Sequence, residues 1–159
     1  MNDEKYKELL IKPKAKLVLV IGLPGSGKTT YMKSLVEQDP QASVYDYYQG
    51  KTKGEEHDAH PKASIHFEPL VQDLKDGKTA IVSDIRYCVA HELNVFLATI
   101  LGEVPQVQVE YTYFENNPEA CRKNVLARNR DGRVEKELEL IDKLSAAYAP
   151  VTTEMLKVQ

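Results

Sequence analysis

The sequence predicts an α/β fold in which a mostly parallel sheet lies between layers of helices. The first observation is a set of short apolar or alternating segments typical of strands, at residues 17–21, 42–46, 79–83 and 106–114. The second is a set of segments with helical spacing, at 30–37, 65–77, 89–101, 118–128 and 134–148. Strands that alternate with helices favour parallel pairing through right-handed crossovers, and ligands then bind where the strands end.

Each strand segment has its own local justification. The run L-V-L-V-I at 17–21 is apolar and β-branched, as in a buried strand, and A-S-V-Y-D at 42–46 is a shorter candidate. T-A-I-V-S at 79–83 is apolar enough to be buried on both faces. Q-V-Q-V-E-Y-T-Y-F at 106–114 alternates in the way that a half-buried strand requires.

The helical segments also carry start and stop signals. The first helix opens near Lys28, directly after a glycine-rich loop. The second has its apolar residues on one face and ends near Gly77, because glycine is a common helix terminator. Asn117 and Pro118 suit the first turn of the fourth helix, and Pro150 stops the last one.

The remaining segments connect these elements within what we expect to be one domain over residues 1–159. Residues 1–16 form a polar N-terminal lead-in, and 49–64 form a polar, aperiodic loop that is long for a compact domain. The tail over 155–158 is a candidate for a short fifth strand.

Composition narrows the class of protein. Hydrophobic content of 42% and charged content of 28% are ordinary for a soluble domain, and no apolar run approaches a membrane span of about 20 residues. The charged N-terminus lacks a signal-peptide core, and Cys88 and Cys121 have no metal or disulfide spacing, so we expect a cytoplasmic protein with reduced thiols and no membrane partner. A net charge of −3 disfavours extended nucleic acid as an obligate partner and leaves a small molecule, nucleotide or single strand end.

Residues 22–29 read G-L-P-G-S-G-K-T and match the phosphate-binding P-loop pattern G-x-x-x-x-G-K-[ST]. The three glycines remove side chains, so that backbone N–H groups can converge on a triphosphate at a helix N-terminus. Lys28 can reach the β- and γ-phosphates, and the Thr29 hydroxyl can hold Mg²⁺. The pattern predicts ATP and Mg²⁺ as cofactors, bound by Gly22, Leu23, Pro24, Gly25, Ser26, Gly27, Lys28, Thr29 and Thr30.

Two carboxylates stand at the ends of predicted strands, beside the expected phosphate site. Asp84 follows the third strand, where it suits a metal ligand like that of a Walker B element or, alternatively, a helix N-cap. Asp46 closes the second strand and suits the general base that accepts a proton from an attacking hydroxyl; its alternative is a turn-forming aspartate. Arg86 suits either an acceptor's phosphate or carboxylate, or an ion pair with a neighbouring carboxylate.

Basic residues gather at the end of the fourth helix and in the turn after it. We expect a lid over residues 128–133, in which Arg128 or Arg130 stabilises the transferring phosphoryl group. The alternative is that these cations complement the negative C-terminus of the helix. Four arginines between positions 122 and 133 exceed what that alternative requires, which favours the lid.

These residues resemble the P-loop kinase superfamily, in particular the polynucleotide-kinase-like branch of small ATP-dependent kinases. The resemblance extends from Leu17 to about Glu154. It rests on G-L-P-G-S-G-K-T-T, Asp46, V-S-D at Val82, F-x-N-N-P-E-x-C at Phe114, the arginine-rich segment and Y-A-P-V-T-T-E at Tyr148.

The resemblance implies a three-layer P-loop NTPase fold with strand order 2-3-1-4-5, and γ-phosphoryl transfer from ATP with Mg²⁺. It casts Lys28 and Thr29 as phosphate and metal residues, Asp46 as the base, and Arg128 or Arg130 as the lid arginine.

Three functions follow from these patterns. The leading one is a kinase that phosphorylates a hydroxyl of a small molecule, nucleoside or nucleic-acid 5′ end. The second is a nucleoside-monophosphate kinase, because S-D-I-R at 83–86 resembles the Asp-x-Arg element with which some such enzymes hold the acceptor phosphate. The third is an ATPase or nucleotide-dependent switch that acts through the 49–64 loop without a phosphorylated acceptor.

Overall fold

The computed structural model describes residues 15–46, 61–63, 66–150 and 154–158. Its four-stranded parallel sheet has the order β2-β3-β1-β4. The strands are β1 (Lys16–Ile21), β2 (Ser43–Asp46), β3 (Thr79–Ser83) and β4 (Gln108–Tyr113). The α/β class and the predicted order of the first four strands are therefore confirmed.

The expected fifth strand is reduced to one bridge. Leu156 pairs in parallel with Phe114 just beyond β4. Its N–H donates to Tyr113 O at 2.9 Å, and its carbonyl accepts from Glu115 N at 2.8 Å. Because Phe114 N donates to Ile21 O of β1, Leu156 lies on the outer edge of β4, in the fifth position of the predicted order. Within 154–158, only this residue pairs with the sheet, which corrects the expected strand over 155–158.

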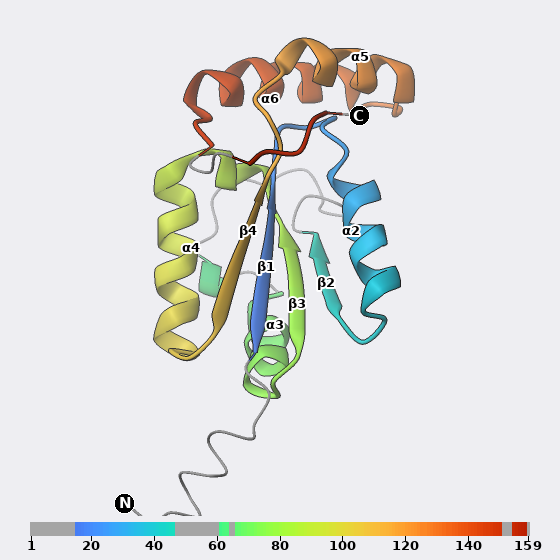
Figure 1. Ribbon diagram of the computed structural model, residues 1–159. Helices are drawn as coiled ribbons and strands as arrows, with labels where there is room; N and C mark the ends of the chain where they lie inside the picture. Colours follow the sequence, from blue (N-terminus) through green and yellow to red (C-terminus); the bar gives the residue numbers. More distant parts are fainter. Residues whose placement is uncertain (1–14, 47–60, 64–65, 151–153, 159) are drawn as a thin grey trace, which may run out of the picture.

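Helices cover both faces of the sheet, as the three-layer prediction requires (Figure 1). The helices are α2 (Lys28–Gln38), α3 (Phe67–Lys75) and α4 (Ala90–Glu103). Leu17, Leu19 and Ile21 of β1 pack in a core with α3 and α4, whereas Val18 and Val20 pack with α2. Alternate side chains of one strand thus build two cores, because successive residues of a strand point to opposite faces.

A pair of helices lies across the carboxyl ends of the strands, at the top of Figure 1. These are α5 (Pro118–Arg128) and α6 (Val134–Ala147). Asn117 begins α5 as expected, since its side chain accepts from Ala120 N at 3.1 Å. Asn129 ends it in a left-handed conformation with φ 44°. The Tyr148 hydroxyl donates to the carbonyls of Phe114 and Ile21, which attaches the end of α6 to the tops of β4 and β1.

Two short 3₁₀ helices depart from the predicted elements. One, η1 (Pro61–Ala63), lies inside the segment expected to be a loop over 49–64. The other, η2 (Ile85–Cys88), follows β3 directly and turns the chain before α4 begins. Residues 1–14 of the expected lead-in over 1–16, and residues 49–60 and 64 of the expected loop over 49–64, lie outside the described residues. The assignment of 1–159 to one domain stays a prediction. None of the helices in the described ranges combines the length and hydrophobicity needed to cross a membrane.

Candidate active site

The glycine-rich loop forms the turn between β1 and α2. Gly25 has φ 83° and Gly27 has φ 104°, and both values lie in the left-handed region that favours glycine. Gly27 is the N-cap of α2, so the helix begins at Lys28. This geometry opens the positive end of α2 toward the carboxyl edge of the sheet, which is the arrangement that binds phosphate groups in other proteins.

The Lys28 ammonium is held inside this loop. Its Nζ donates hydrogen bonds to Gly22 O at 2.8 Å and to Leu23 O at 2.7 Å. Burial lowers the pKa of Lys28 because it disfavours the charged form, and the neighbouring Asp46 carboxylate only partly opposes this shift. A triphosphate beside Lys28 would supply the negative charge that its surroundings lack.

Helix α5 packs directly on the loop, which the sequence patterns do not indicate. Asn124 Nδ2 donates to Gly25 O at 2.8 Å, across 99 positions of the chain. A Cβ atom at Gly25 would lie 2.6 Å from Cys121 O, so the two backbones touch at a place where only glycine fits. Asn124 on its own is an ordinary polar helix residue, and no local signal distinguishes it.

We expect Gly25→Ala to lower the free energy of unfolding by about 3 kcal/mol. This sums about 1–2 kcal/mol for a left-handed non-glycine backbone and about 1–3 kcal/mol for the overlap with Cys121. Gly132→Ala is the matched control, because Gly132 also has a positive φ, of 72°, but its Cβ would meet nothing within 4 Å. Urea denaturation of both variants measures the difference. Equal losses would show that α5 does not constrain the loop.

Most of the predicted site residues line one pocket of about 530 Å³. Six of the nine predicted nucleotide-binding residues line it, namely Pro24, Gly25, Gly27, Lys28, Thr29 and Thr30. Gly22, Leu23 and Ser26 are buried within the loop and do not line it. The wall also contains Asp46 from β2, and Arg128 and Arg130 from the end of α5 and the turn after it. Three segments that are distant in sequence thus face one cavity.

Oxygen donors suited to Mg²⁺ gather beside the P-loop. Asp46 is paired with Ser83 in the register of β2 and β3, and both line the pocket with Thr29. The Ser83 hydroxyl is buried and makes no hydrogen bond within the described part of the chain. Hydroxyl and carboxylate oxygens, completed by water, are the ligands that Mg²⁺ prefers. These residues therefore fit a magnesium ion, and the sequence patterns missed Ser83.

Asp84 is held by its neighbour Arg86. Its Oδ1 accepts from Arg86 N at 2.9 Å, as the N-cap of η2, and its Oδ2 accepts from Arg86 Nε at 2.9 Å. The pocket wall at this strand end comes from Ser83 and Ile85. Asp84 thus adopts the N-cap and Arg86 the ion-pair arrangement that the sequence left open, and Asp84 as a metal ligand stays a prediction.

The two cysteines are free and buried beside the same loop. Burial raises the pKa of Cys88 to about 12 and that of Cys121 to about 11. Both thiols are therefore protonated at neutral pH, which gives them no nucleophilic role.

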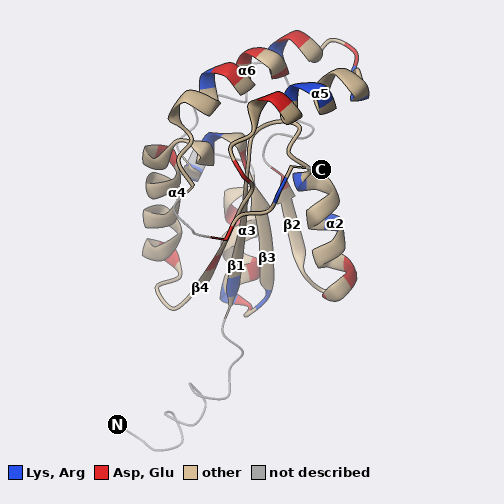
Figure 2. Cartoon of the chain, turned by 45° about the horizontal axis from the view of Figure 1, so that its top comes forward, with Lys and Arg blue, Asp and Glu red and all other residues tan. Residues whose placement is uncertain are grey.

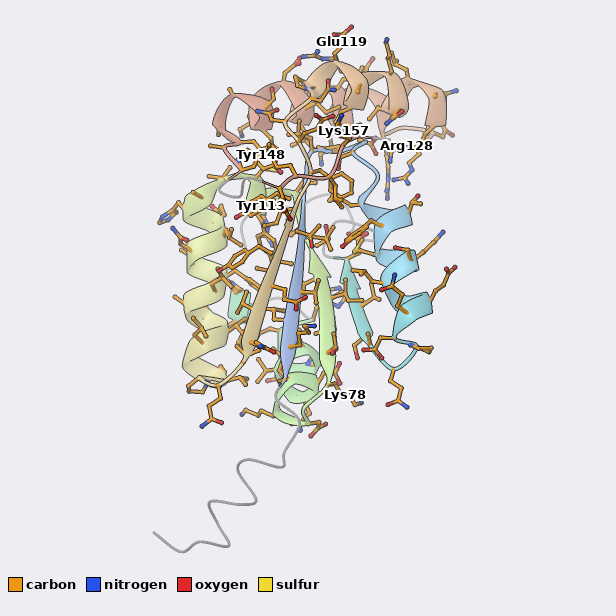
Figure 3. All side chains as sticks on the ribbon, viewed as in Figure 1. Lys78, Tyr113, Glu119, Arg128, Tyr148 and Lys157 are labelled. Carbon is orange, nitrogen blue, oxygen red and sulfur yellow. The ribbon has the colours of Figure 1, made fainter. Side chains whose placement is uncertain are left out.

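The pocket wall has two further charged residues that the sequence patterns missed, Lys33 of α2 and Glu137 in the first turn of α6. Glu137 is the unusual one. Only 1% of it is exposed, although a glutamate in a first turn ordinarily lies in solvent and complements the helix dipole. Its Oε2 accepts from Arg128 at 2.7 Å. Arg128 projects from α5 below the helix pair, on the side of α2 (Figure 3).

The parallel sheet, the glycine loop and the arginine-bearing helix pair define a P-loop domain of the kinase type, as predicted. Residues 17–151 match the model of the AAA_33 family, described as an AAA domain. The chain therefore belongs to this family.

The chain is also similar to one viral protein in sequence and to several solved structures in fold. An uncharacterized protein of Acanthamoeba polyphaga mimivirus is 29% identical over 133 residues, which cover 83% of this chain and 85% of that protein. The structure resembles a fungal RNA kinase with a TM-score of 0.63 and 18% identity, over 90% of this chain and 69% of that one. It also resembles APE1195 with a TM-score of 0.59 and 17% identity, over 92% and 86%. The structure of the Pnkp1/Rnl/Hen1 RNA repair complex matches with a TM-score of 0.54 and 13% identity, over 85% of this chain and 46% of that one.

Proposed function

We propose that the protein is an ATP-dependent phosphotransferase that moves the γ-phosphoryl group of ATP to a hydroxyl acceptor. One observation carries this proposal: the P-loop, the Asp46 carboxylate and the arginines Arg128 and Arg130 line a single pocket. A nucleotide-binding loop alone suits many functions. A carboxylate and cations placed around the same phosphate site suit phosphoryl transfer in particular, because the reaction needs a proton acceptor and neutralisation of the transferring group.

Each residue has a defined task in this mechanism. The loop amides and Lys28 bind the phosphates. Thr29 and Ser83 would hold Mg²⁺, which would offset negative charge on the phosphates. Asp46 accepts the proton of the acceptor hydroxyl. The acceptor oxygen then bonds to the γ-phosphorus, while the bond from that phosphorus to the β,γ-bridging oxygen breaks and its electron pair stays with ADP. Arg128 and Arg130 stabilise the charge on the phosphoryl oxygens during transfer.

The acceptor class is a small molecule, a nucleoside or the 5′ end of a nucleic acid. Two of the structural neighbours are named as an RNA kinase and as part of an RNA repair complex, which favours including RNA ends among the acceptors tested. The net charge of −3 favours contact with one strand end over an extended tract. Arg86 donates to Asp84 at 2.6 Å, and this ion pair gives no support to a nucleoside-monophosphate kinase that would use Arg86 for its acceptor phosphate.

A transfer screen with γ-labelled ATP tests the proposal. The purified protein with Mg²⁺ is offered 5′-hydroxyl oligonucleotides, nucleosides, nucleoside monophosphates and small metabolites, and labelled products are separated from ATP and free phosphate. A labelled hydroxyl compound supports the kinase. A labelled diphosphate would favour the monophosphate kinase instead. Release of free phosphate alone would favour an ATPase or switch and contradict the proposal.

A further inference from the structure

Glu137 of α6 has an environment that an ordinary surface glutamate would not have. It is 1% exposed and lies in the wall of the phosphate pocket. Its Oε2 accepts a hydrogen bond from Arg128 at 2.7 Å. Its Oε1 accepts none from the described part of the chain, and Arg130 Nη1 lies 3.8 Å from it. A buried carboxylate with one unfilled oxygen is costly, so its presence in a pocket wall calls for a reason beyond the fold.

A second ion pair between the same two helices gives the comparison. Arg122 of α5 donates to Asp142 of α6 at 2.5 Å, and their side chains are 41% and 65% exposed. This pair joins α5 to α6 outside the pocket and leaves both charges in solvent. Figure 2 shows that both helices carry acidic and basic residues along their lengths. Joining the helices therefore does not require a buried carboxylate, and Glu137 differs from Asp142 in facing the phosphate site.

We infer that Glu137 is a positioning residue that holds Arg128 over the site of the terminal phosphate and receives Arg130 through its second oxygen when ATP is bound. A guanidinium has five N–H donors in a planar fork, so Arg128 can keep its bond to Glu137 and donate to a phosphate at the same time. Arg130 Nη1 is too far from Glu137 Oε1 for a hydrogen bond, so Oε1 is free to accept one if Arg130 moves closer. This inference rests on the proposed binding of ATP in the pocket and does not require transfer to an acceptor.

The test is the ratio of the affinities for ATP and ADP, measured by calorimetry with Mg²⁺ and no acceptor. Arg128→Ala should lower the preference for ATP about tenfold or more, the magnitude expected for a lost hydrogen bond between charged groups. Glu137→Ala should lower the preference for ATP by most of the same factor. Glu137→Gln should lower it by less, because the amide oxygen can still accept a hydrogen bond from Arg128. Asp142→Asn, the matched control outside the pocket, should leave the ratio within about twofold of the wild type.

A triple variant separates positioning from a merely structural role. If Glu137 acts only through the two arginines, then adding Glu137→Ala to a protein that already carries Arg128→Ala and Arg130→Ala should leave the ATP/ADP affinity ratio unchanged. Additive effects would overturn the inference, as would a folded Glu137→Ala protein with the wild-type ratio. If thermal unfolding shows that Glu137→Ala does not fold, the same comparison is made with Glu137→Gln.

The outcomes for the two proposals are distinct. A wild-type protein that prefers ATP but labels no acceptor would contradict the proposed kinase and leave the role of Glu137 to be decided by the variants. A wild-type protein that binds ATP and ADP equally would overturn the positioning role itself, because Arg128 would then contact no terminal phosphate.

Discussion

Lys28→Ala is expected to lower kcat/KM for phosphoryl transfer about a thousandfold or more and to weaken ATP binding. Removal of one donor that acts on developing charge typically costs about 10²–10³ in rate. Lys28 has a second task that adds to this loss, because its ammonium also bonds to Gly22 O and Leu23 O and holds the loop closed. Calorimetry with MgATP and the transfer assay measure the two effects separately.

Lys123→Ala is the control for this variant, because Lys123 is exposed on α5 and does not line the pocket. It removes the same charge and should bind ATP as the wild type does.

The pH dependence of ATP binding gives a further check. Burial lowers the pKa of Lys28, so ATP affinity should fall as the pH rises through that lowered value and the ammonium becomes neutral. Lys28→Ala should lack this fall in ATP affinity. If Lys28→Ala bound ATP with wild-type affinity, the glycine-rich loop would not be the phosphate-binding site.

Asp46→Asn is expected to reduce kcat for transfer by about 10²–10⁴, the usual contribution of a general base. Asparagine has nearly the same shape but cannot accept the hydroxyl proton. The affinity for ATP should change little, since Asp46 acts on the acceptor and the nucleotide phosphates bind to the loop and to Lys28. Single-turnover transfer and nucleotide calorimetry on the same preparation distinguish loss of chemistry from loss of binding.

Asp76→Asn provides the matched control, because Asp76 is exposed at the end of α3 and does not line the pocket. It should transfer phosphate at the wild-type rate. Unchanged turnover in Asp46→Asn would exclude Asp46 as the base. A large loss of ATP affinity would instead indicate that Asp46, together with Thr29 and Ser83, mainly serves to hold Mg²⁺.

Most secondary structure was predictable because its signals are local. The α5 bounds of 118–128 agree with the prediction, since Asn117 and Pro118 mark its start within one turn. The strands β1 and β3 agree within a residue, because apolar β-branched runs have few alternative conformations. The predicted extent of the fifth strand, residues 155–158, was wrong. Only Leu156 of that tail pairs with the sheet, and the alternation of a four-residue segment carries too little information to indicate this.

The site was predictable to the extent that its chemistry lies in short motifs. The P-loop and the carboxylate that closes β2 line the same pocket, because all the strands of a parallel sheet end at the same edge. Ser83 and Glu137 were missed. One resembles any serine at a strand end and the other any glutamate in a first turn, and their unusual feature is burial, which depends on the neighbours that the fold supplies.

Residue types and their spacing were thus enough to predict the class of fold, the glycine-rich turn between β1 and α2, and the helix boundaries to within about two residues, since these depend on backbone preferences and periodicity within a few positions. The contact of Asn124 with Gly25 and the buried pair of Glu137 and Arg128 appear only once the chain is packed. Such contacts depend on the distances between layers and on which side chains lose water, and a one-dimensional pattern contains neither quantity.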